Sequence, residues 1–153
     1  MTELELTSSS APIWRRVAAL VYDLFILLAI SMAYGAVVLI AYSVINGAPE
    51  KDYSQFANGP LFQLGWYLSL AGFYYFFWRK DGQTIGMRAW RLKLLGNDNQ
   101  RASVKNCIVR ILISPVLVVS LLIGYFWKLI DRDKLCLHDR LSKTKVVVIA
   151  KSK

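Results

Sequence analysis

Three long apolar runs, separated by short polar stretches, dominate the pattern of the chain. The first extends over residues 17–45 and contains one charged residue, Asp23. The second, over residues 61–78, is uncharged, and the third extends from Cys107 to about Ile130. Because a helix of about 20 apolar residues crosses the hydrocarbon core of a bilayer, these runs predict membrane helices. The first run exceeds the apolar part of a signal peptide, about 7–15 residues, so we expect it to stay as an anchor.

The polar stretches predict a tail, a loop and two strands. Residues 1–12 are polar and acidic, which favours a disordered N-terminal tail before a single membrane domain over residues 13–150. Residues 46–60 contain two prolines, two glycines and two asparagines, a composition typical of a loop. Short strands are predicted near Trp90–Leu95 and Thr144–Ile149. Because a single strand leaves its backbone groups unpaired, we expect the two to pair with each other.

Basic residues are concentrated between the apolar runs, and the formal net charge is +9. In a soluble protein this excess would suggest nucleic-acid binding, but beside apolar runs it indicates membrane orientation. The positive-inside rule places residues 79–106 and the N-terminus in the cytoplasm, and residues 46–60 outside. We therefore expect a multi-pass protein of the bacterial cytoplasmic (inner) membrane.

The basic tail that begins at Asp131 conflicts with a simple topology. Its charge favours the cytoplasm, yet one full crossing by the third run would place it outside. We prefer a third run that is broken or re-entrant at Pro115, because proline removes a helical hydrogen bond and clashes with the preceding turn. The alternative is three full crossings. The preferred fold is a mainly α polytopic membrane protein with two full transmembrane helices and a small cytoplasmic two-stranded β element.

Two charged residues of the first run have helical spacing. Asp23 follows Arg16 by seven residues, close to two helical turns, so both lie on one face. Arg16 can extend to the membrane interface, but the shorter Asp23 cannot, and an ionised carboxylate at that depth is costly unless it is paired or hydrated. Such a residue is a functional candidate by default. The alternative is a buried salt link that fixes helix packing, with Arg16, Arg110 or a tail cation as partner.

The sequence contains little that indicates catalysis. His138 and Asp139 are adjacent, and His138 could titrate near neutral pH, but no recognisable nucleophile accompanies them. The single histidine excludes a multi-histidine metal site, and no phosphate-binding glycine motif is present. Cys107 and Cys136 match no metal-binding pair, so we expect both to be reduced. We therefore expect no enzyme, no catalytic residue, no metal and no cofactor.

Three segments in this order resemble the RDD family of bacterial membrane proteins, which is named for one arginine and two aspartates: residues 15–23 (RRVAALVYD), 81–95 (DGQTIGMRAWRLKLL) and 137–148 (LHDRLSKTKVVV). The resemblance implies that Arg16 is the arginine and that Asp23 and Asp139 are the two aspartates. Arg110 fits an arginine that is usual at the start of the last apolar run. Met87 stands where the family commonly has lysine. Four further residues match the middle segment: Gln83, Thr84, Gly86 and Arg88.

The resemblance implies a role in transport without a substrate. We expect transport across the inner membrane, with the carboxylate of Asp23 exchanging a proton for a small cation. The alternative is a non-transporting scaffold that binds anionic lipid or a partner through its basic cytoplasmic surface. Expected partners are the lipid bilayer with its anionic headgroups, further copies of the chain in a homo-oligomer, and a small cation or proton. Nucleic acid is not expected.

Overall fold

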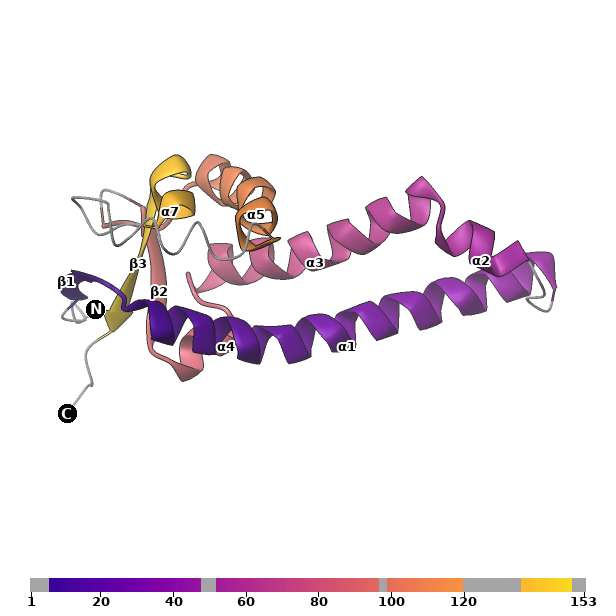
Figure 1. Ribbon diagram of the computed structural model, residues 1–153, viewed down its shortest axis with the longest axis horizontal. Coiled ribbons are helices and arrows are strands. Elements are labelled where there is room, and N and C mark those ends of the chain that lie inside the picture. The colour runs from indigo at the N-terminus through magenta and orange to yellow at the C-terminus, as the bar shows by residue number, and fades with distance from the viewer. Residues whose placement is uncertain (1–5, 48–51, 97–98, 120–135, 150–153) are drawn as a thin grey trace. The chain divides into compact units, whose positions relative to one another are not determined.

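The computed structural model describes residues 6–47, 52–96, 99–119 and 136–149 (Figure 1). The chain divides into two compact units, and the single membrane domain over residues 13–150 stays a prediction. We call Met1–Asp23 with Tyr74–Lys153 the sheet unit, and Leu24–Phe73 the hairpin unit. The elements follow in this order: β1 (Leu6–Ser10), α1 (Ile13–Asn46), α2 (Asp52–Ala57), α3 (Pro60–Lys80), α4 (Ile85–Ala89), β2 (Leu92–Gly96), α5 (Val104–Val119), α7 (Leu137–Leu141) and β3 (Thr144–Ile149).

Helix α1 has the properties of a membrane helix. Its 34 residues span about 50 Å at 1.5 Å per residue, more than the roughly 30 Å of a bilayer core. Among the described residues it is the one helix that is both long and apolar enough to cross a membrane. Large apolar side chains stand out from it, with Phe25 69% exposed and Val44 80% exposed. A continuous exposed apolar surface of this kind suits lipid rather than water.

In the hairpin unit, polar contacts connect α1 with α3. The hydroxyl of Tyr34 donates to the carbonyl oxygen of Phe62 at 2.9 Å, and the indole nitrogen of Trp66 donates to the hydroxyl of Ser31 at 2.9 Å. Gly65 leaves room for the ring of Tyr34, which a side chain there would displace. Helix α3 has 21 residues but is on average less apolar than α1, so the number of crossings stays a prediction.

One short helix interrupts the predicted loop over residues 46–60. Residues 52–57 (DYSQFA) form α2. The prediction of a continuous loop is therefore wrong for this segment. The reason is that the prolines and glycines of the stretch flank these six residues and do not fall among them, so no breaker prevents a helical turn.

The sheet unit is built on three antiparallel strands in the order β1-β3-β2 (Figure 1). Strands β2 and β3 are the two that the sequence predicted, and they pair with Leu94 opposite Val146. Residues 6–10, placed by the sequence in a disordered tail, instead form the edge strand β1. The free edge of β3 explains this correction, because backbone groups there can pair with a neighbour of any sequence.

The third apolar run begins as α5, which extends from Val104 to Val119 and includes Pro115. The prediction of a break at Pro115 is therefore wrong. A proline removes one hydrogen bond of a helix, and the remaining bonds can carry the helix past it, as is common in apolar membrane helices. Residues 120–130 of the run lie outside the described residues, so re-entry itself stays a prediction. The first turns of α5 bury Cys107 and Arg110 in the sheet unit.

Candidate functional site

The first turns of α1 carry the charged residues that the sequence singled out. The buried residues of α1 are Arg16, Ala19 and Asp23. Their spacing of three and four residues places them on one helix face. Arg16 is 5% exposed and Asp23 is 3% exposed, so neither charge is in contact with bulk solvent. The two side chains nevertheless reach different partners.

Asp139 of α7 is the acceptor for two arginines. It is fully buried, and its Oδ2 accepts from Nη1 of Arg16 while its Oδ1 accepts from Nη1 of Arg110 at 2.6 Å. Both guanidinium groups are buried as well. One carboxylate therefore bridges α1, α5 and α7. Among the described residues the ion pairs of this cluster join two positive charges to one negative, so further acceptors help to satisfy the guanidinium groups.

Arg16 has two further acceptors, one directly after β1 and one on β3. Its Nε donates to the carbonyl oxygen of Ala11 at 3.2 Å, and its Nη2 donates to that of Val146 at 3.2 Å. Its Nη1 also lies 3.3 Å from the sulfur of Cys136. Through these contacts and Asp139, one side chain holds the end of β1, strand β3 and the start of α7 against α1.

Arg110 uses a hydroxyl and an aromatic ring. Its Nη1 donates to Oγ1 of Thr144 at 2.6 Å, and that hydroxyl lies 2.7 Å from Oγ of Ser142. The guanidinium carbon lies 5.4 Å from the centre of the Trp78 ring, a distance at which the ring attracts a cation. The hydroxyl of Thr144 and the ring of Trp78 are neutral, and both stabilise the guanidinium of Arg110 beside Asp139.

Asp23 lies in a different environment. Its Oδ2 accepts from the hydroxyl of Thr84 at 2.5 Å, and its Oδ1 accepts from the backbone nitrogen of Gly86 at 2.9 Å. Thr84 is also the N-cap of α4 and accepts from the nitrogen of Met87 at 3.1 Å. No cationic group pairs with Asp23 among the residues that the structure describes. The carboxylate is thus buried and held by neutral donors.

The absence of a side chain at Gly86 allows this contact. A Cβ atom there would overlap the carbonyl oxygen of Ala19 and lie 2.9 Å from Oδ1 of Asp23. Helix α4 therefore approaches α1 backbone to backbone. This approach brings the nitrogen of Gly86 within hydrogen-bonding reach of the carboxylate.

The other predicted residues support this arrangement to different degrees. Gln83 donates from Nε2 to the carbonyl oxygen of Leu92 at 2.6 Å, which fixes the segment before α4 onto β2. Arg88 pairs with Asp81 at 2.7 Å on the exposed surface, away from the buried aspartates. His138 belongs to α7, and its side chain lies outside the described residues. The structure thus forms two groups, one around Asp139 and one around Asp23.

Sequence reasoning missed several partners of these groups. The sequence pattern places Thr144 only in a strand, Trp78 only in the second apolar run and Cys136 only in the basic tail. For Thr144, the sequence offers one signal of a contact with the cluster, because its hydroxyl side chain lies close along the chain to the segment that contains Asp139. Among the described residues, no group of three or more His, Cys, Asp or Glu side chains could hold a metal ion.

Comparison with known proteins gives one match. The model of the RDD family matches residues 10–143, which is most of the chain. No curated protein and no solved structure matches. The matched range contains Arg16, Asp23, Arg110 and Asp139, so both buried groups lie inside it. On the extent of this match, the chain belongs to the RDD family of membrane proteins.

Proposed function

We propose that this protein is a small transporter of the bacterial inner membrane that exchanges a proton for a small cation at Asp23. The proposal rests on the different partners of the two buried aspartates. Asp23 is a buried carboxylate in the membrane helix whose partners are a hydroxyl and an amide, whereas Asp139 is neutralised by two guanidinium groups. Of the two aspartates, Asp23 is therefore the one whose charge a proton or a cation could neutralise.

The physical reason lies in the cost of a buried charge. Neutral donors stabilise a carboxylate but leave its net charge in place, and that charge is costly in apolar surroundings. A bound proton or monovalent cation removes the net charge. Either one competes for the oxygen lone pairs that Thr84 and Gly86 now use. Exchange at Asp23 is thereby coupled to the contact between α1 and α4.

The Asp139 cluster supports a common side for the basic segments. The N-terminal end of α1, the first turns of α5 and helix α7 meet at one carboxylate. This meeting supports a common side of the membrane for the three segments, and their basic composition favours the cytoplasm. A protomer of this size brings few helices to enclose a path, so we propose that it works as a homo-oligomer of closed symmetry.

Cysteine labelling in intact cells tests this sidedness. Cys107 and Cys136 are fully buried, so the native thiols give little background. A cysteine in place of Lys151 should resist an impermeant thiol reagent until the cells are permeabilised. A cysteine in place of exposed Gln55, expected outside, serves as the positive control and should react at once. Labelling of the Lys151→Cys variant from outside would contradict the common cytoplasmic side.

Proton flux in proteoliposomes tests the exchange. We expect addition of Na⁺ or K⁺ to drive proton movement in vesicles that contain the native protein. The Asp23→Asn variant should reduce this movement to the level of protein-free vesicles, because the amide cannot take up a proton or balance a cation. Asn still offers an acceptor to Gly86, so the fold should persist. The matched control is Asp81→Asn, which removes an exposed carboxylate and should leave the flux unchanged.

Two results would contradict the proposal. If Asp23→Asn supports as much flux as the native protein, the carboxylate is not the exchange site. If no cation drives proton movement in any preparation that is folded and inserted, the scaffold alternative gains support. That alternative predicts binding of anionic lipid or of a partner without pH-dependent flux.

A further inference from the structure

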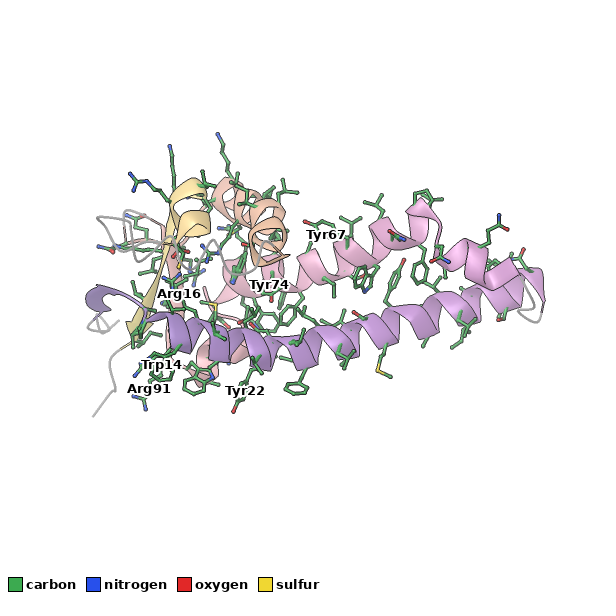
Figure 2. All side chains as sticks on the ribbon, in the orientation of Figure 1. Trp14, Arg16, Tyr22, Tyr67, Tyr74 and Arg91 are labelled. Carbon is green, nitrogen blue, oxygen red and sulfur yellow. The ribbon has the colours of Figure 1, made fainter. Side chains whose placement is uncertain are left out.

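A second polar feature of the sheet unit lies apart from both buried aspartates. A surface pocket of about 230 Å³ is lined by Trp14, Arg15, Ala89, Trp90 and Arg91. Figure 2 shows Trp14 and Arg91 beside the first turns of α1. The rings of Trp14 and Trp90 meet edge to face with centres 5.4 Å apart, and the guanidinium of Arg15 lies 5.2 Å from the centre of the Trp14 ring. The lining residues thus supply two indoles and two cations.

Two hydrogen-bond donors at this pocket have no acceptor within the part of the chain that the structure describes. Nε of Arg15 and Nε1 of Trp90 are shielded from solvent, and neither has a partner among the described residues. A buried donor without an acceptor costs about 1–3 kcal/mol, so such groups usually mark a missing ligand or water. Because both groups are donors, the group that satisfies them must present acceptor oxygens.

The backbone at Arg91 has a conformation that arginine rarely adopts. Arg91 has a φ of 54°, in the left-handed region, directly after the C-cap residue Trp90 of α4. Glycine is the usual residue at such a helix end, because a Cβ atom makes this conformation unfavourable. An arginine there retains a strained backbone while it contributes a cation to the pocket. Strain of this kind is concentrated at binding sites.

We propose that this pocket binds the phosphate of an anionic phospholipid headgroup. A phosphate oxygen accepts from guanidinium and indole N–H groups and neutralises the two cations. Three features favour a lipid: the pocket adjoins the first turn of the membrane helix, its indoles are of the type found at membrane interfaces, and Trp14 is 57% exposed. Basic residues beside a membrane helix attract anionic lipid in the same way. The site is independent of exchange at Asp23.

Native mass spectrometry of the full-length protein in micelles tests the proposal. The protein is offered equal amounts of phosphatidylglycerol and phosphatidylcholine, and the ratio of retained lipids is measured. We expect a preference for phosphatidylglycerol that falls about fivefold in Arg91→Gly, from the roughly 1 kcal/mol that one cation contributes near a lipid surface. The melting temperature of this variant should be unchanged or higher, because glycine relieves the strained backbone.

Two further variants ensure that the result does not depend on Arg91→Gly alone. Arg15→Gln removes the second cation and should also lower the preference about fivefold. Exposed Arg101, outside the pocket, provides the matched control, and Arg101→Gln should retain the native ratio. If Arg91→Gly unfolds, the comparison of Arg15→Gln with Arg101→Gln alone decides.

The proposal is overturned if the pocket variants retain the ratio of the Arg101→Gln control. It is also overturned if millimolar inorganic phosphate displaces the lipid, because the pocket would then take a free anion. Displacement by soluble polyglutamate would likewise overturn it and would identify an acidic protein segment as the occupant. Retention of phosphatidylglycerol against both competitors supports the lipid site.

Discussion

Replacement of Asp139 by asparagine is expected to lower the free energy of unfolding by about 3–5 kcal/mol, the largest effect of any single change considered for this protein. The carboxylate is fully buried between Arg16 and Arg110, whose side chains are only 4% and 6% exposed. Without it, both buried guanidinium groups lose the carboxylate that they share. A protein stabilised by only about 5–15 kcal/mol would lose much of its folded population.

Thermal melting of the purified protein in detergent measures this loss. Asp81→Asn is the matched control, because it removes the same charge from an exposed pair that contributes about 0–1 kcal/mol. A second substitution, Arg110→Met, in the Asp139→Asn background should recover part of the stability by removing one unbalanced charge. A melting temperature for Asp139→Asn that equals that of Asp81→Asn would show that the cluster does not hold the fold.

Replacement of Gly86 by alanine is expected to cost about 1–3 kcal/mol from overpacking, and more if the hydrogen bond to Asp23 is lost with it. The added Cβ would overlap the carbonyl oxygen of Ala19, a backbone atom that cannot move aside as a flexible side chain can. Either α4 moves away from α1, or α1 distorts. Both outcomes remove donors from the carboxylate of Asp23.

Melting temperature and cation-driven proton flux should therefore fall together in Gly86→Ala. Gly35 of α1 gives the matched control, because it is a helical glycine with nothing within 4 Å of the position that its Cβ would occupy. Gly35→Ala should be neutral or stabilising, since alanine favours helix. If Gly86→Ala melts at the native temperature and retains its flux, the close approach of α4 to α1 is not required.

The pairing of β2 with β3 could be predicted from the sequence, whereas β1 could not. Alternation of apolar and basic residues around Leu92 and the β-branched run after Thr144 are local signals. Residues 6–10 (LTSSS) have no such signal, because their strand depends on the edge that β3 offers. The prediction of a helix break at Pro115 was wrong for a related reason. Its effect on a helix depends on the surrounding hydrogen bonds, which a residue type alone does not reveal.

Helical spacing predicted the shared face of Arg16 and Asp23 but not their partners. Spacing within one helix determines which side chains point the same way, and the partners come from distant parts of the chain. Asp139 lies 123 residues after Arg16, and Thr84 lies 61 residues after Asp23. The sequence left open whether Arg16 or Arg110 would pair with Asp23. Both arginines instead pair with Asp139, because α7 returns to the start of α1.

Exchange of a proton is expected at Asp23 and not at Asp139, and infrared difference spectroscopy on the reconstituted protein can measure it directly. Addition of Na⁺, or of K⁺ in a separate experiment, should displace a proton from Asp23 and remove a protonated-carboxyl band. The native protein and Asp81→Asn should both show this change, and Asp23→Asn should lack it. A cation-dependent carboxyl band that persists in Asp23→Asn would contradict the assignment of exchange to this residue.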